Sequence, residues 1–207
     1  MKIWEHAPEH DYEKHYKLKE GDVFVEGGAF VGRYARKASS KVGNSGRVVS
    51  IEPSPLNLIT LRESLEGINN VTIVEKALWN KKGKGELTLF SPREDQSQIN
   101  SGDMLKAVSG IRENVTYVDI KTDTLDNILA DLGIESVNLL GWDIEGAEVG
   151  ALEGMKKSLS SGSILNMGLC FYHKAESEIR QAINTIKSYE NYQFIENDRG
   201  ILYAGLK

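Results

Sequence analysis

The sequence has one cysteine, few prolines and no long apolar run. The single cysteine, Cys170, excludes an internal disulfide and any cluster of cysteines around a metal. None of the apolar runs approaches the roughly 18 residues that a membrane-spanning helix needs. Residues Met1–His6 lack the apolar core of a secretory signal. We therefore expect a cytoplasmic protein with no membrane partner.

The chain also lacks an excess of basic residues. It carries 25 Lys and Arg against 30 Asp and Glu, a formal net charge of −5. Proteins that bind nucleic acid usually present a basic stripe, so we expect no nucleic-acid partner. The length of 207 residues, with 40% hydrophobic and 27% charged residues, is typical of one soluble domain. We predict a single domain over 1–207, and the sequence does not indicate its oligomeric state.

Short β-rich runs alternate with helical patterns along the chain. This alternation predicts an α/β fold, with a mostly parallel Rossmann-like sheet and helices on both faces. Asn197-Asp198-Arg199-Gly200 lies between the last two apolar runs and indicates an antiparallel C-terminal hairpin. We expect strands near 22–27, 47–52, 71–75, 137–142, 163–170, 192–196 and 200–206, and helices near 31–43, 54–67, 123–132, 147–160 and 174–189.

Two segments lie outside this alternation. Residues 1–20 are interpreted as an amphipathic helical leader, with His6, His10 and His15 on its surface because they show no metal-ligand spacing. Residues 91–114 are rich in Ser, Asn and Gly and show no clear period. A loop of that length in a compact domain is usually functional or mobile. We therefore predict a substrate lid over 91–114.

The run from Asp22 to Glu52 is the most informative part of the sequence. An apolar strand ends on Glu26 and opens into Gly27-Gly28-Ala29-Phe30-Val31-Gly32, and the next strand ends on Glu52. Glycines allow close approach of a ligand to the backbone, and an acid after the second strand is placed to accept hydrogen bonds from ribose hydroxyls. The pattern predicts a nucleoside-binding crevice.

Further motifs follow in order between about residues 21 and 155. They are Val49–Pro55, Val74–Leu78 with Gly83, Thr124-Leu125-Asp126 before a helix, and Asp143-Ile144-Glu145-Gly146-Ala147-Glu148. With the glycine-rich run Gly21–Gly32, these motifs resemble the FkbM-type methyltransferases. The resemblance implies a class I methyltransferase fold, S-adenosyl-L-methionine as cofactor, and methyl transfer to a hydroxyl oxygen of a small molecule or sugar. The C-terminal hairpin agrees with this fold class better than with dehydrogenases.

The resemblance also implies which residues contact the donor. Ala77 and Leu78 would lie against adenine, although core packing explains them nearly as well. The family usually has Asp-Val-Gly-Ala-Asn where this chain has Glu26-Gly27-Gly28-Ala29-Phe30, and a lysine where this chain has Gly141. The implied donor-binding residues are Glu26, Gly28, Ala29, Phe30, Gly32, Glu52, Pro53, Ala77, Leu78 and Asp143.

Catalysis is predicted to involve Asp143, His173 and Glu145. An attacking hydroxyl must lose its proton, and histidine is the side chain whose ordinary pKa suits this near neutral pH. His173 is a candidate base or a helix cap, Asp143 either orients the acceptor or is itself the base, and Glu145 is a catalytic acid or a first-turn helix residue. No metal site is expected. Two other functions stay open: a donor-binding protein without catalysis, and an NAD-dependent oxidoreductase.

Overall fold

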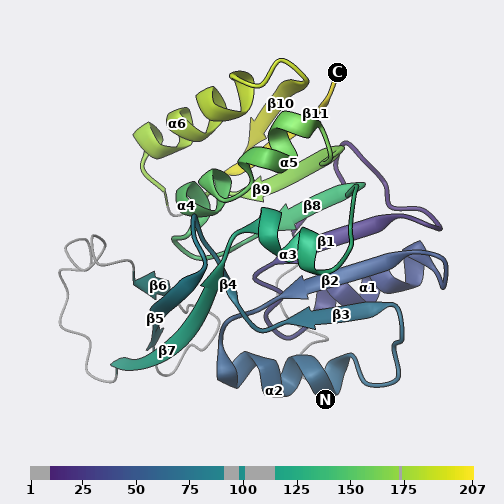
Figure 1. Cartoon of the computed structure of the whole chain (residues 1–207), viewed down its shortest axis with the longest axis vertical. Helices are drawn as coiled ribbons and strands as arrows, with labels where there is room; N and C mark the ends of the chain where they lie inside the picture. The colour runs from purple at the N-terminus through teal and green to yellow at the C-terminus, as the bar shows by residue number, and fades with distance from the viewer. Residues whose placement is uncertain (1–9, 91–97, 101–114, 173) are drawn as a thin grey trace.

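A central sheet forms the middle layer of the protein. The structure, a computed structural model, describes residues 10–90, 98–100, 115–172 and 174–207. Within these residues the sheet has seven strands in the order β10-β11-β9-β8-β1-β2-β3 (Figure 1). Their bounds are β1 Val23–Gly27, β2 Arg47–Ile51, β3 Val71–Val74, β8 Leu139–Trp142, β9 Asn166–Cys170, β10 Tyr192–Asp198 and β11 Ile201–Leu206.

The sheet is parallel except at β11, which pairs antiparallel with both β9 and β10. The chain runs outward from β1 through β2 to β3 and then returns to place β8 on the other side of β1. Strand order therefore reverses between β1 and β8, where open α/β sheets bind ligands. The predicted fold class, with its C-terminal antiparallel hairpin, is confirmed.

Helices cover both faces of the sheet, as predicted. Neighbouring residues of a strand point to opposite faces, so Phe24 packs with α1 and α2 while Val25 packs with α3, α4, α5 and α6. Across the described residues, no helix has the length and apolar character needed to cross a bilayer. The helices are α1 Arg33–Val42, α2 Pro55–Ser64, α3 Leu125–Asp131, α4 Glu148–Glu153, α5 Lys156–Ser161 and α6 Glu176–Lys187.

A second, four-stranded sheet was not predicted. It has the order β4-β7-β5-β6, with β5 and β7 paired antiparallel along their length. Leu87, Leu89 and Ile120 turn inward from it to the core on the α3–α6 face of the central sheet. Figure 1 shows this sheet on the side of the molecule toward which β2 and β3 point. Its strands are β4 Ala77–Leu78, β5 Gly83–Phe90, β6 Gln98–Asn100 and β7 Val115–Asp123.

The structure differs from the sequence-based expectation at two helices. The described part of the leader, residues 10–20, contains turns and irregular chain and no helix, so a helical leader is wrong there. The helix expected over 147–160 is two short helices, because α4 ends at its C-cap Gly154 and the Met155 backbone, with a φ of −122° and a ψ of 24°, is not helical. Most of the predicted lid, residues 91–97 and 101–114, lies outside the described residues.

Candidate functional site

Three acids meet where the parallel strands end. Glu26 lies near the end of β1, Glu52 directly follows β2, and Asp143 directly follows β8. Because β1 pairs with both β2 and β8, their carboxyl ends share one edge of the sheet. The strand-end placement predicted for these acids is confirmed.

The glycine-rich turn after β1 is fitted tightly to the rest of the chain. Gly28 has a φ of +74°, and a Cβ there would lie 1.9 Å from the carbonyl oxygen of Asp143. At Gly32, with φ +82°, a Cβ would lie 2.5 Å from Ser64 Oγ. Both positions therefore need glycine for the packing of the protein itself, a reason that the sequence pattern did not supply. Contact of this turn with a ligand stays a prediction.

The carboxylate of Glu52 holds this turn in place by accepting hydrogen bonds from it and from the start of α2. Its Oε2 accepts a hydrogen bond from Phe30 N at 2.9 Å, and its Oε1 accepts from Ser54 N and from Asn57 Nδ2. The Phe30 backbone has a φ of +49°, which is uncommon for a residue with a side chain. Burial raises the pKa of Glu52 to about 7, against the effect of the three donors. Ribose contact by Glu52 stays a prediction, and of the roughly four lone-pair sites of a carboxylate about one is left beyond these three bonds.

Among the described residues, Glu26 and Glu148 are the buried acids with an oxygen that lacks a hydrogen bond, and only Glu148 has a cation, Lys174, beside that oxygen. Glu26 is 4% exposed, and among the described residues its Oε2 has no hydrogen-bond partner. Burial, and then the charge of Glu52, raises the pKa of Glu26 well above its usual value. A buried polar atom without a partner costs free energy. The arrangement therefore suits a ligand that brings a hydrogen-bond donor to Glu26.

The other residues predicted to bind the donor are mostly accounted for by the packing of the protein itself. Ala29 is buried on the α1–α2 face and Pro53 is half-buried. Ala77 and Leu78 form β4 and are buried in the core, where Leu78 Cδ1 would lie 2.8 Å from a Cβ at Gly27. Core packing thus accounts for both residues of β4, and their contact with adenine stays a prediction.

The segment after β8 is a tight turn held by a buried ion pair. Gly146 N donates to Glu148 Oε1 at 2.9 Å, while Lys174 Nζ donates to the Gly146 carbonyl and lies 3.3 Å from Glu148 Oε2. Burial raises the pKa of Glu148, whereas the Lys174 charge opposes this. Glu148 therefore stabilises the turn. Glu145, with a φ of +44°, is half-buried within it, and its catalytic role stays a prediction.

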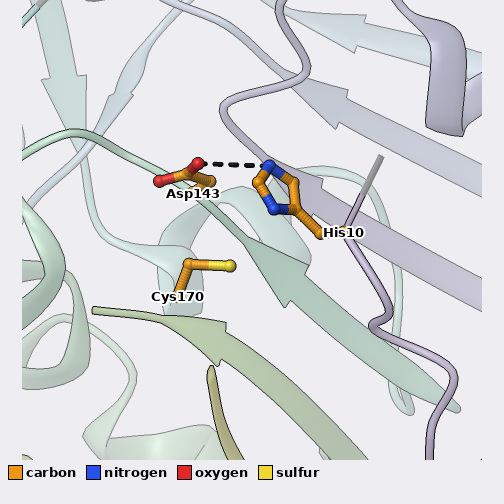
Figure 2. A group of neighbouring side chains, drawn as sticks. All are labelled: His10, Asp143 and Cys170. Carbon is orange, nitrogen blue, oxygen red and sulfur yellow. Dashed lines mark ion pairs between the residues drawn. The ribbon is translucent and has the colours of Figure 1, made fainter. Parts of the chain in front are cut away.

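His10 is a residue of the site that the sequence did not identify. Its Nε2 lies 3.1 Å from Asp143 Oδ2 and its Nδ1 lies 3.3 Å from the Tyr172 hydroxyl (Figure 2). The His10 side chain is 22% exposed, so it takes part in these contacts while it remains partly open to solvent. His15 is exposed as expected, with Nε2 2.6 Å from Glu196 Oε1. His173 and His6 lie outside the described residues.

Tyr12 explains how the leader reaches this edge of the sheet. A Cβ at Gly141 of β8 would lie 2.6 Å from Tyr12 Cδ2, and one at Gly168 of β9 would lie 3.0 Å from Tyr12 Cα. The two glycines are partners in the sheet register, so together they form a slot for Tyr12. A lysine at position 141, as in the resembling family, would collide with this ring.

Cys170, at the end of β9, completes the group around Asp143. Figure 2 shows Cys170 next to Asp143 and His10. The ligand atoms of the three side chains all lie within 4.8 Å of one another. The thiol is fully buried. Burial, and then the charge of Asp143, raises the pKa of Cys170 well above its usual value. No signal in the local sequence could have joined His10 to these two strand ends.

Comparison with solved structures shows the same fold in known enzymes. The methyltransferase FkbM from Methylobacillus flagellatus KT superposes with a TM-score of 0.64 and 18% identity, covering 94% of this chain and 46% of that one. Aeropyrum pernix fibrillarin, solved with natively bound S-adenosyl-L-methionine, gives 0.56 and 15%, covering 90% and 67%. These likenesses place the protein in the class I methyltransferase fold.

Sequence comparison identifies the family. A curated relative, 2-O-methyltransferase NoeI of Sinorhizobium fredii (strain NBRC 101917 / NGR234), is 21% identical over 118 residues, which are 53% of this chain and 47% of the relative. The chain thus matches about half the length of that relative. The family model described as the methyltransferase FkbM domain matches residues 23–195. The chain belongs to the FkbM methyltransferase family.

Proposed function

We propose that the protein transfers a methyl group from S-adenosylmethionine to a hydroxyl oxygen of a small molecule or sugar. Family membership supports methyl transfer, and the 2-O-methyltransferase relative supports oxygen as the acceptor atom. The observation that carries the donor assignment is the pair of buried acids, Glu26 and Glu52, at the ends of neighbouring strands, with Glu26 Oε2 unpartnered among the described residues.

The roles of the chain's own residues follow from where they lie. Glu52 would accept hydrogen bonds from the ribose hydroxyls, and Glu26 would accept from a donor group of the ligand. Bound S-adenosylmethionine supplies the methyl group, and the protein holds the acceptor oxygen in line with it, which removes several kcal/mol from such barriers. Asp143, at the strand-order reversal, would position the acceptor hydroxyl. His173 as the base and Glu145 as a further catalytic residue remain part of this proposal.

Donor binding tests the assignment. We expect S-adenosylmethionine, and not NAD, to bind in calorimetry, and Glu52→Gln to weaken it about tenfold to hundredfold through loss of charge-assisted bonds. Glu75→Gln is the matched control, because Glu75 follows the next strand but its side chain is 57% exposed and pairs with Arg62. NAD binding, or equal affinity in the two variants, would remove the assignment. Release of S-adenosylhomocysteine with hydroxyl acceptors then separates an enzyme from a donor-binding protein.

The pH dependence of donor binding gives an independent check. The pKa of Glu52 is raised to about 7, so much of it is protonated at pH 6. Ribose hydroxyls favour the ionised carboxylate, hence donor affinity should rise between about pH 6 and 8 with release of a proton. Glu52→Gln should lose this rise. Calorimetry in buffers of different ionisation enthalpy measures the proton.

A further inference from the structure

We propose that His10, Asp143 and Cys170 form a three-ligand site for a zinc-like divalent metal ion at the acceptor side of the crevice. The three side chains come from the leader, the end of β8 and the end of β9. Their imidazole, carboxylate and thiol ligand atoms lie within 4.8 Å of one another (Figure 2). That the bound ion acts on the acceptor rests on the proposed function; the binding site itself does not.

The spacing suits one ion. Two ligands bonded to the same tetrahedral Zn²⁺ at about 2.0–2.3 Å lie about 3.3–3.8 Å apart. His10 Nε2 and Asp143 Oδ2, now 3.1 Å apart, need only a small separation to admit it. The distances to the Cys170 sulfur are at most 4.8 Å, so side-chain rotation has to close them by no more than about 1 Å.

The ligand types indicate which ion would bind. A thiolate and an imidazole favour Zn²⁺ or Co²⁺ over Mg²⁺ and Ca²⁺, which prefer oxygen ligands. The thiol proton of Cys170 leaves to solvent when the sulfur bonds to the ion. The Tyr172 hydroxyl at 3.3 Å from His10 Nδ1 supports the ring from its far side, as outer partners of metal-bound histidines do.

The coordination would be incomplete with these three ligands. Zinc sites with three protein ligands keep a fourth position for water or substrate. The side chains of His10 and Asp143 are 22% and 19% exposed, so the group is reached by solvent from their side. An acceptor hydroxyl bound to the ion there would ionise more readily, as metal-bound water does.

Cobalt binding tests the site without an assay of activity. Cys170 is the only cysteine in the chain, so a thiolate-to-Co²⁺ charge-transfer band in chelator-treated, tag-free protein can arise from this residue alone. We expect one Co²⁺ per chain with that band, displacement by Zn²⁺, loss of the band in Cys170→Ser, and at least about tenfold weaker binding in His10→Ala. His15→Ala is the control, because His15 lies on the same leader but contacts Glu196 instead.

The outcomes separate the site from the proposed function. A wild-type protein that is folded by circular dichroism yet shows no thiolate–cobalt band overturns the proposal, and leaves His10 and Asp143 as a hydrogen-bonded pair. Equal cobalt affinity in His10→Ala and His15→Ala also overturns it. Calorimetry with S-adenosylmethionine on the same metal-free protein reports the donor crevice separately, because Glu26 and Glu52 are not metal ligands in this proposal.

Discussion

Gly28 packs closely against the carbonyl oxygen of Asp143, at the position where any other residue would carry its side chain. A Cβ there would lie 1.9 Å from that oxygen, and the residue has a φ of +74°. We expect Gly28→Ala to lower the free energy of unfolding by about 2–5 kcal/mol, combining the left-handed backbone with overpacking. Urea unfolding followed by circular dichroism measures this loss.

Gly67 provides the matched control for Gly28. Its φ of +76° is nearly the same, but a Cβ there would meet nothing within 4 Å. Gly67→Ala should therefore lose only the backbone share, about 1–2 kcal/mol. Equal losses in the two variants would show that Gly28 is needed for its backbone angle alone.

Some residues of the candidate site could be predicted from the sequence, and others could not. Glu26, Glu52 and Asp143 could be placed because each ends an apolar strand, and parallel strands end at one edge. His10 could not, because its place depends on Tyr12 crossing two strands that are formed more than a hundred residues later in the chain. No pattern in the sequence around His10 indicates that contact.

Among the elements, helix α5 is capped by a residue of α3, which accepts hydrogen bonds from its first turn. Asp126 Oδ2 accepts from Lys157 N at 2.8 Å, and Oδ1 accepts from both the amide and the hydroxyl of Ser158. Asp126→Ala leaves these first-turn donors of α5 without this partner. We expect it to lower stability by about 1–3 kcal/mol in thermal unfolding.

Asp131, on the same helix, tests whether any lost acid has this effect. Its side chain is 63% exposed and lies 4.0 Å from Lys76. Asp131→Ala should change stability by less than about 0.5 kcal/mol. A similar loss in both variants would mean that the net charge, and not the cap of α5, determines the result.

The strands that could not be predicted from the sequence are stabilised by pairing with strands far away along the chain. β5 opens with Gly83-Lys84-Gly85, residues that are depleted in strands, and it is held by its pairing with β7 from Gly83↔Thr122 to Phe90↔Val115. The central strands were predictable because they are apolar and buried on both faces. Helix α2 was predictable because Ser54 caps it and Pro55 begins it.

At the scale of the whole molecule, the leader substitutes for a helix over part of one face of the sheet. Tyr12 is 1% exposed and fills the slot over Gly141 and Gly168. Tyr12→Ala should cost about 3–5 kcal/mol, as for other large aromatic residues removed from a core. Tyr117→Ala, at a side chain that is 54% exposed on β7, should cost far less.

Both tyrosine variants can be followed by urea unfolding, with tryptophan fluorescence as the signal. A small loss in Tyr12→Ala would mean that the sheet closes over the slot or that the leader is not bound in solution. In that case His10 would also lose its place beside Asp143, and the cobalt titration above would show it.

The contact between the leader and the hairpin has a consequence for how the protein is made. The Tyr203 hydroxyl donates to the Asp11 carbonyl at 2.7 Å across 192 positions of sequence. At roughly 5–20 residues per second, a ribosome needs on the order of 10–40 s to travel that distance. During that interval the nascent leader lacks its last partners, and Tyr12 remains available to other apolar surfaces. The group around Asp143 therefore cannot form until the ribosome has passed Cys170, and the contact with Tyr203 can be added only after that.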